Sequence, residues 1–245
     1  MKNHLLKVTE NVRIAENVWK MALESPELEE QKPGQFVNIK LDGLYLRRPI
    51  SVCDSDPGCL TIVYKVVGKG TEQMAGLKPG RTLDVLTGLG NGYDLSKSGD
   101  RPLLLGGGVG VPPLILLARK LREAGKEVTA VLGFNRKAEI FGEMDFRNLG
   151  CSTAITTADG SRGVKGFVTD ALPEDYSYFY TCGPEPMLKA VYRATKTSGQ
   201  FSFEERMGCG FGACMGCSCK TITGYKRICR EGPVLEKEEI RWAKL

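Results

Sequence analysis

Alternating hydrophobic and polar positions dominate the first 95 residues of the chain. Five short runs show this pattern, namely LLKVTENVRI, VWKMAL, QFVNIKL, CLTIVYKVV and TLDVL, and Pro-Gly or Asp-Gly turns separate them. Such runs are typical of strands that bury one face and are joined by tight turns. We therefore predict an antiparallel barrel, interrupted by one short helix at residues 71–77.

The pattern changes at residue 101 to a buried strand, a glycine-rich turn, an apolar helix at 113–124 and another strand at 127–133. This order is that of a βαβ unit. Further apolar strands at 151–156 and 178–182 alternate with expected helices that begin at 168 and 186. The second part of the chain is therefore predicted to be a doubly wound α/β domain with a parallel sheet.

Regular periodicity fades from residue 200, where cysteines become frequent. We expect a metal group to organise this last part. The prediction is thus an α/β plus all-β protein with three parts: a barrel over 1–98, a parallel-sheet domain over 99–199 and a small C-terminal subdomain over 200–245.

Composition narrows the class of function. The formal net charge of +5 is spread among acidic residues without a basic stripe, so nucleic acid is not an expected partner. No apolar signal segment is found near the start, and the uncharged stretch 102–118 contains four glycines and three prolines, so we expect a cytoplasmic protein without a membrane span. The only histidine is His4. Catalysis is therefore expected to depend on cofactors and not on a side-chain acid or base.

Five of the nine cysteines lie between residues 209 and 229. Four of them have the spacing C-x4-C-x2-C-x11-C, which is typical of a plant-type [2Fe-2S] cluster. The predicted ligands are Cys209, Cys214, Cys217 and Cys229. A four-cysteine zinc site is the alternative, although zinc sites favour two C-x2-C pairs and only one is present. Cys219 does not fit the spacing and is either a free thiol or a substitute ligand.

Three segments of the first domain predict a flavin dinucleotide site on the barrel. An arginine followed three residues later by a hydroxyl can bind a pyrophosphate, and a glycine-flanked helix start can bind an anion. The predicted residues are Arg48, Pro49, Ile50 and Ser51 at the end of a strand, Val63, Tyr64 and Lys65 in a later strand, and Gly70 and Thr71. Taken singly, Arg48 is better explained as a surface charge and Tyr64 as a core aromatic residue, but the order of these segments along the chain favours the flavin site.

The second domain contains two segments typical of nicotinamide dinucleotide binding. Gly106, Gly108 and Gly110 form a glycine-rich turn between a strand and a helix. Cys182, Gly183 and Pro184 follow a later strand of the same sheet. A plain packing turn and an inert buried thiol are the alternatives for these two segments.

With these motifs, residues 5–197 resemble ferredoxin-NADP reductases. The tail segments ERMGCG at 205–210 and CREGPV at 229–234 resemble the electron-transfer subunit of NAD-linked dihydroorotate dehydrogenases. The family's Leu-Gly-Asn-Gly-Phe segment is present as LGNGY at 89–93. The resemblance implies FAD on the barrel residues given above, a [2Fe-2S] cluster on the four cysteines, and NAD. It also implies an FMN-containing catalytic partner, a heterotetramer and a role in pyrimidine biosynthesis.

Related architectures serve sulfide dehydrogenases, hydrogenases, sulfite reductases and ferredoxin-dependent transhydrogenases, so another electron-transfer complex is the alternative function. Some transhydrogenases use an aspartate as a cluster ligand, whereas the first position here is Cys209. A redox sensor or a zinc-stabilised binding module is a further alternative. NADP also stays open, because Arg136 or Arg162 could bind a 2'-phosphate.

Overall fold

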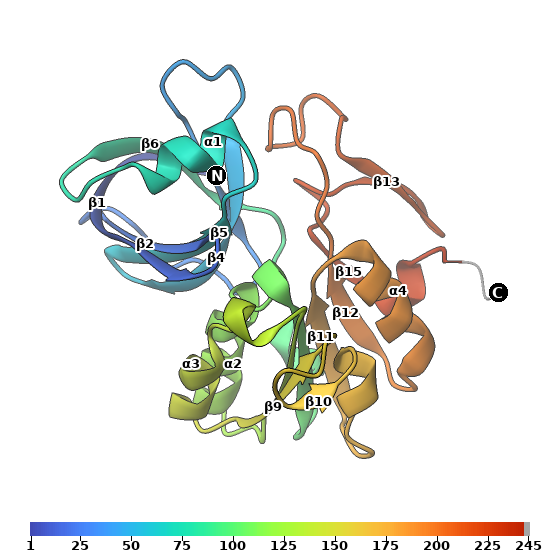
Figure 1. The fold of residues 1–245 in the computed structure, drawn as a ribbon. Coiled ribbons are helices and arrows are strands. Elements are labelled where there is room, and N and C mark those ends of the chain that lie inside the picture. Colours follow the sequence, from blue (N-terminus) through green and yellow to red (C-terminus); the bar gives the residue numbers. More distant parts are fainter. Residues whose placement is uncertain (243–245) are drawn as a thin grey trace.

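In a computed structural model, which describes residues 1–242, the first part of the chain is a closed antiparallel barrel (Figure 1). The strands follow the order β1-β2-β5-β4-β3-β6. Their bounds are β1 Lys2–Ala15, β2 Val18–Glu24, β3 Phe36–Ile39, β4 Arg48–Asp56, β5 Cys59–Lys65 and β6 Thr82–Leu89. The predicted barrel is confirmed.

Alternate residues of the strands fill the barrel. Leu6 and Val8 of β1, for example, are fully buried and meet Ile62 of β5 in one core. The predicted helix is present as α1, Lys69–Ala75, and begins two residues early. The Thr71 hydroxyl accepts hydrogen bonds from the amides of Val67 and Gly68, so the first turn forms ahead of Thr71.

The placement of Arg48 at the end of a strand is wrong, because Arg48 begins β4. The strand before it, β3, ends at Ile39, and the connecting segment turns through Gly43 with a φ of 71°. A positive φ suits glycine and breaks a strand.

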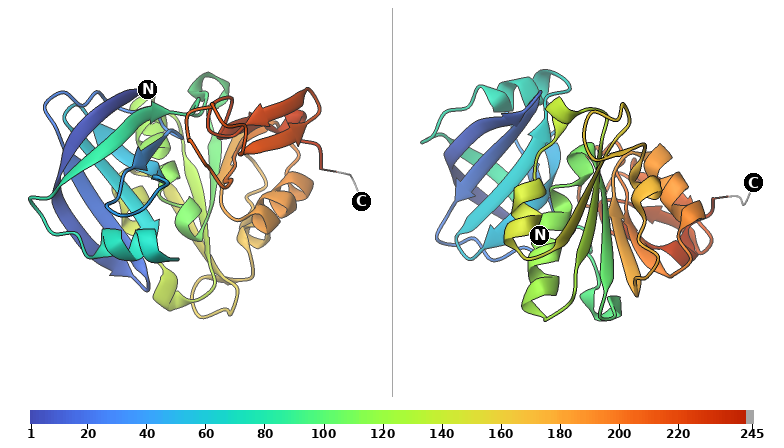
Figure 2. Two further views of the ribbon diagram at one scale, coloured as in Figure 1. Left: turned by 90° about the horizontal axis from the view of Figure 1, so that it is seen from above. Right: turned by 60° about the horizontal axis from the view of Figure 1, so that its bottom comes forward.

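The second part is a twisted sheet of mainly parallel strands in the order β10-β9-β8-β7-β11-β12-β15 (Figure 2). The strands are β7 Pro102–Gly107, β8 Thr129–Phe134, β9 Ser152–Thr157, β10 Val164–Lys165, β11 Tyr178–Cys182, β12 Gly199–Ser202 and β15 Val234–Glu236. Helices α2 Pro113–Glu123, α3 Glu143–Asn148 and α4 Glu185–Ala194 accompany them, with 3-10 turns at Leu95–Lys97, Gly108–Gly110, Lys137–Glu139, Val168–Ala171 and Lys237–Glu239.

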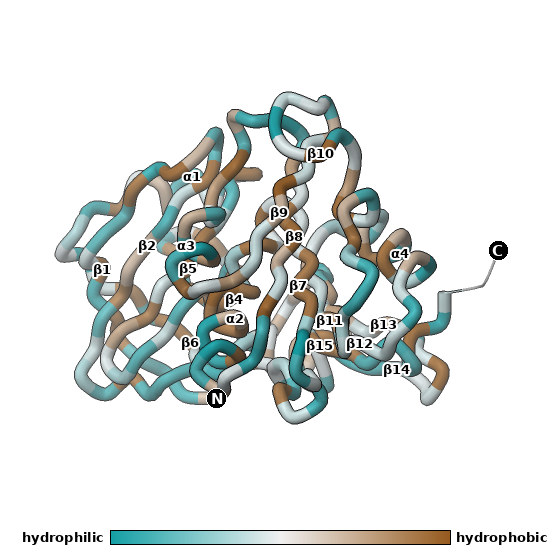
Figure 3. Tube along the Cα trace, turned by 90° about the horizontal axis from the view of Figure 1, so that it is seen from below, coloured by the Kyte–Doolittle hydropathy of each residue, from teal (hydrophilic) through white to brown (hydrophobic). Residues whose placement is uncertain are grey.

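Successive residues of β7 pack on opposite faces of this sheet. Leu104 belongs to the core that contains α2, whereas Leu103 and Leu105 pack with Leu188 of α4. Figure 3 shows the resulting hydrophobic trace along β7 and β8. Helices therefore cover both faces, which confirms the doubly wound fold.

The prediction of a helix that begins at residue 168 is wrong. Only a 3-10 turn forms at Val168–Ala171, because the Asp170 carboxylate accepts a hydrogen bond from the Phe167 amide and Pro173 follows closely. Proline disfavours the helical conformation in the residue before it. The short helix α3 did not stand out in the sequence.

The C-terminal part has more regular structure than its weak periodicity predicts. β12 pairs with β11 in parallel, and β15 pairs antiparallel with β12 at the edge of the sheet. Between them, β13 Ser218–Thr221 and β14 Gly224–Arg227 form a small hairpin. The cysteine-rich loop lies between β12 and this hairpin, on the barrel side of the sheet (Figure 1). Among residues 1–242, no helix is long and apolar enough to cross a membrane.

Candidate functional site

The four predicted cluster ligands lie close together as two pairs. Cys209 and Cys214 share a partly exposed loop, and their side chains are hydrogen-bonded to each other. Cys217 and Cys229 are buried, and their side chains are also in contact. The spacing C-x4-C-x2-C-x11-C therefore folds into one surface-exposed pair and one covered pair.

Backbone amides of the loop point at the ligand sulfurs. The amides of Ala213 and Cys214 lie 3.2 and 3.4 Å from Sγ of Cys209. Amides of Cys209 and Gly216 each lie 3.4 Å from Sγ of Cys214, and the amide of Cys229 lies 3.4 Å from Sγ of Cys217. Five N–H groups thus surround the thiols, as the glycine-rich sequence predicts.

These contacts change the acidity of the thiols. Burial raises the pKa of Cys209, but amide and thiol hydrogen bonds outweigh it and lower the pKa to about 6. Burial and the nearby Cys217 sulfur raise the pKa of Cys229 to about 12. The loop therefore favours the thiolate of Cys209, and metal binding would displace the proton of Cys229.

Arg227, the last residue of β14, stabilises the loop by contacting its backbone. Its guanidinium donates a 2.6 Å hydrogen bond to the carbonyl of Gly212 and forms an ion pair with Glu231. Gly210 and Gly212 have φ values of 77° and 94°, which allow the tight turns of the loop. The cysteines are therefore held by the fold itself.

The pairwise arrangement fits a binuclear cluster better than a single zinc ion. A [2Fe-2S] group takes two thiolates on each iron, whereas zinc takes all four around one atom. Cys219 lies on β13 and packs against Cys217 and Cys229 from outside the pairs.

The predicted flavin residues come together on one side of the barrel. β4 and β5 are hydrogen-bonded neighbours, and Gly70 of α1 lies against the Arg48 side chain, so that a Cβ on Gly70 would be 2.1 Å from Nε. Arg47 forms an ion pair with Asp84, whereas the Arg48 guanidinium contacts only backbone carbonyls within the described chain. The Arg48 guanidinium thus forms no ion pair within the described residues, and its contact with a flavin phosphate remains a prediction.

Two of the predicted flavin residues have other contacts as well. The Tyr64 side chain is 2% exposed in the barrel core, and its hydroxyl donates a 2.9 Å hydrogen bond to Asn11. The Thr71 hydroxyl is engaged at the start of α1. The Tyr64 side chain is therefore engaged in the barrel core, and the flavin role of Pro49, Ile50, Ser51, Val63, Tyr64 and Lys65 remains a prediction.

The two nicotinamide segments meet at the carboxyl edge of the sheet. β7 and β11 are parallel neighbours, with Gly106 opposite Cys182. A Cβ on Gly110 would be 2.3 Å from the carbonyl oxygen of Cys182. One on Gly183 would be 2.7 Å from the Met187 sulfur. Gly108, with a φ of 52°, has no atom within 4 Å of its Cβ position, so this turn is open to a ligand.

Cys182 is a neutral thiol at this edge. Burial raises its pKa to about 12, and its side chain is hydrogen-bonded to Ser202 on the neighbouring strand. The neutral thiol form is therefore favoured at this position. Both arginines considered for a 2'-phosphate are paired: Arg136 with Glu16 and Glu139, and Arg162 with Glu143.

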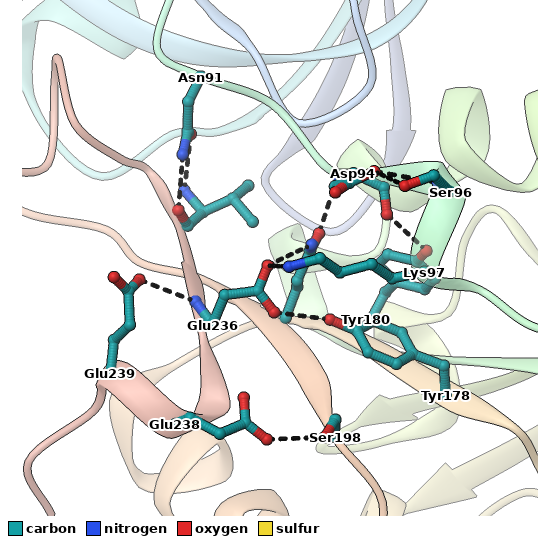
Figure 4. A network of polar contacts seen from close by, with 12 residues as sticks. Asn91, Asp94, Ser96, Lys97, Tyr178, Tyr180, Ser198, Glu236, Glu238 and Glu239 are labelled. Atoms are coloured by element: carbon teal, nitrogen blue, oxygen red, sulfur yellow. Dashed lines mark hydrogen bonds and ion pairs between the residues drawn. The ribbon is translucent and has the colours of Figure 1, made fainter.

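A polar network joins the three parts of the chain (Figure 4). Glu236 on β15 accepts hydrogen bonds from Lys97, Tyr178 and Gln200. Asn91, after the last barrel strand, binds the backbone of Val234. The segment that follows the last cysteine ligand is thereby fixed to both the barrel and the sheet.

Two contributors were not predicted as site residues, Asn38 and Phe36 on β3. Both contact the cysteine-rich part, Asn38 through the Cys209 carbonyl and Phe36 through a core with Cys217 and Cys229. Asparagine is depleted in strands, so its presence inside the run QFVNIKL is the signal that could have revealed it.

Comparisons with solved structures define the class. The chain has a TM-score of 0.89 and 34% identity to an NADH-dependent reduced ferredoxin-NADP oxidoreductase, covering 98% of this chain and 90% of the other. A ferredoxin NADP+ reductase from Neisseria gonorrhoeae, at 16% identity, shares the fold with a TM-score of 0.67 over 79% of this chain and 90% of its own. The chain is a flavoprotein reductase of the ferredoxin reductase type, to which an iron-sulfur subdomain is added.

Sequence relatives define the family within this class. The model for the iron-sulfur cluster binding domain of dihydroorotate dehydrogenase B matches residues 204–241. The electron transfer subunit of dihydroorotate dehydrogenase B (NAD(+)) from Fusobacterium nucleatum is 45% identical over 96% of both chains. That from Geobacillus sp. strain WCH70 is 43% identical over 98% of this chain and 99% of its own. The chain belongs to this family of electron transfer subunits, and its cofactors are FAD, a [2Fe-2S] cluster and NAD.

Proposed function

We propose that this chain passes electrons from a partner dihydroorotate dehydrogenase subunit through a [2Fe-2S] cluster and FAD to NAD+, in pyrimidine biosynthesis. The observation that carries the proposal is the cysteine-rich loop: two thiol pairs with five amides on their sulfurs, packed on the barrel that carries the flavin residues. A flavin exchanges electrons singly or in pairs, and so can connect the cluster to hydride transfer.

Each part of the chain has a separate task in this proposal. Residues 1–98 hold FAD through Arg48, Pro49, Ile50, Ser51, Val63, Tyr64, Lys65, Gly70 and Thr71. Residues 99–199 hold NAD through Gly106, Gly108, Gly110, Cys182, Gly183 and Pro184. Residues 200–245 hold the cluster through Cys209, Cys214, Cys217 and Cys229. The neutral, buried Cys182 thiol supports a role in packing at the nicotinamide side without proton transfer.

The exposed side of the cysteine loop supports a partner that docks there. Phe211 and Met215, on either side of Cys214, are 43% and 54% exposed. Apolar side chains beside a redox group favour a protein interface over free solvent. We propose that the partner is an FMN-containing catalytic subunit and that two copies of each chain form a heterotetramer in the cytoplasm.

Cofactor analysis tests the first part of the proposal. The chain is purified anaerobically, and FAD, iron, acid-labile sulfide and zinc are measured together with the visible spectrum. We expect one FAD, two irons and two sulfides per chain, and reduction of a dye by NADH. A stoichiometric zinc without sulfide would contradict it.

The 34% identity to an NADH-dependent ferredoxin-NADP oxidoreductase favours a second candidate, the reductase subunit of another electron-transfer complex. The two candidates predict the same cofactors and differ in the electron donor. Dihydroorotate-dependent NADH formation with the partner subunit separates them.

A further inference from the structure

The cysteine-rich part of the chain packs against strand β3 of the barrel. Val37 and Ile39 point into the barrel core, so Phe36 and Asn38 lie on its outer face. Phe36 shares a core with Cys217 and Cys229, the covered pair. Nδ2 of Asn38 donates a 3.2 Å hydrogen bond to the carbonyl oxygen of Cys209, in the exposed pair. Two neighbouring outward side chains of one strand thus contact both thiol pairs.

The same face of the barrel carries part of the predicted flavin site. β3 pairs with β4, with Asn38 opposite Pro49 and Phe36 opposite Ser51. Residues directly opposite each other in antiparallel strands point to the same side, with Cβ atoms about 4.5–5.5 Å apart. Asn38 therefore lies between the first cluster ligand and the strand that is expected to hold the flavin.

The surroundings of Asn38 are built for a polar side chain. The residue is 1% exposed, and a Cβ on Gly210 would be 2.3 Å from its Nδ2, so only glycine allows the loop to approach this closely. Oδ1 is buried and has no hydrogen-bond partner among residues 1–242. A buried acceptor without a donor is unfavourable in a folded protein. An amide is nevertheless present at this position, because its Nδ2 reaches the carbonyl oxygen of Cys209.

We propose that Asn38 is a positioning residue for electron transfer between the cluster and the flavin. By binding the Cys209 carbonyl it fixes the Cys209–Gly210 peptide, where the loop begins that brings the Ala213 and Cys214 amides to the Cys209 sulfur. Those amides stabilise the more negative, reduced state of the cluster, because a hydrogen bond strengthens with charge on its acceptor. Asn38 therefore sets both the potential of the cluster and its place beside the flavin strand. This inference depends on the proposed function, since it needs both cofactors.

The test compares Asn38→Leu, which keeps the size but removes the polar atoms, with the wild-type chain and with Asn148→Leu. Asn148 is exposed at the end of α3, away from the cysteine loop. For each full-length protein with its cofactors, three quantities are measured anaerobically: the midpoint potential of the cluster, the rate of flavin reduction by NADH, and the rate of cluster reduction that follows.

For Asn38→Leu we expect unchanged flavin reduction by NADH, cluster reduction slowed at least tenfold, and a lower cluster potential. A tenfold change in a one-electron equilibrium corresponds to about 59 mV. If this variant retains too little cluster, Asn38→Ser replaces it, because the shorter hydroxyl cannot reach the Cys209 carbonyl and the same shifts are expected. Wild-type potential and transfer rate in the loaded variant would overturn the inference. Absence of flavin or cluster from the wild-type chain would instead overturn the proposed function.

Discussion

Asn91 binds both backbone groups of Val234. Its Nδ2 lies 2.7 Å from the Val234 carbonyl oxygen, and the Val234 amide lies 3.1 Å from its Oδ1. Nδ2 also donates to the Glu231 carbonyl, and the Asn91 amide donates to that of Gly232. The Asn91 side chain, which follows the last barrel strand, thus makes hydrogen bonds to the segment after Cys229 of the kind that a neighbouring strand would make (Figure 4).

Replacing Asn91 with alanine should loosen the cluster without affecting the flavin. Three side-chain hydrogen bonds are lost, at about 0.5–1.5 kcal/mol each, so docking of the segment should weaken by about 1.5–4.5 kcal/mol. We expect iron release to a chelator to become at least tenfold faster while FAD content stays the same. Asn148→Ala is the matched control. Equal release rates in both variants would show that Asn91 does not hold the cluster subdomain.

Gly70→Ala should weaken FAD binding. The new Cβ would be 2.1 Å from Nε of Arg48, and because that side chain can swing away, the helix survives while the guanidinium moves. We expect at least a tenfold rise in the dissociation constant of FAD, measured by fluorescence during reconstitution. Gly80→Ala, whose Cβ position has no neighbour within 4 Å, controls for general destabilisation and should retain FAD.

Gly110→Ala should abolish the reaction with NADH while leaving the flavin and cluster in place. Its Cβ would be 2.3 Å from the Cys182 carbonyl, which belongs to the backbone and cannot move aside cheaply. The two nicotinamide segments would be forced apart. Stopped-flow reduction of FAD by NADH should slow at least 100-fold, and Gly76→Ala, at an ordinary φ of −80° and with no atom closer than 3.5 Å to the new Cβ, should match the wild type. Normal rates for Gly110→Ala would argue against NAD binding at this edge.

Cys53 should make the folded chain less stable at alkaline pH. It is 5% exposed between the barrel and α2, and burial raises its pKa far above the ordinary value of 9.0. Above about pH 9 the unfolded chain releases this proton and the folded chain retains it, so stability falls as pH rises, by up to about 1.4 kcal/mol per unit.

Urea unfolding at several values from pH 8 to pH 10.5 measures this slope. Cys53→Ala should lose stability overall but show a shallower decline with pH. Cys59→Ala serves as the control, because Cys59 is exposed. A decline for Cys53→Ala as steep as that of the wild type would refute the assignment.

Much of the fold was predictable because local patterns decide it. The alternation in 5–95 and the buried strand at 178–182 agree with the barrel and with β11. Tertiary contacts decide the elements that the sequence did not predict. β15 forms because it pairs with β12 and because the Asn91 side chain binds its backbone. Val168–Ala171 remains a single turn because the Asp170 carboxylate binds the Phe167 amide. The four cysteines lie close together, as their spacing predicts, whereas the Asn38 contact depends on a loop 171 residues away in sequence.

The most direct test of the central claim is NADH formation from dihydroorotate. The chain is purified anaerobically with and without a co-expressed dihydroorotate dehydrogenase catalytic subunit, and absorbance at the NADH band is followed after dihydroorotate and NAD+ are added. We predict NADH formation only when both subunits are present. Bound FAD and cluster with NADH-dye activity, but without coupling to dihydroorotate, would contradict the claim and assign the chain to another electron-transfer complex.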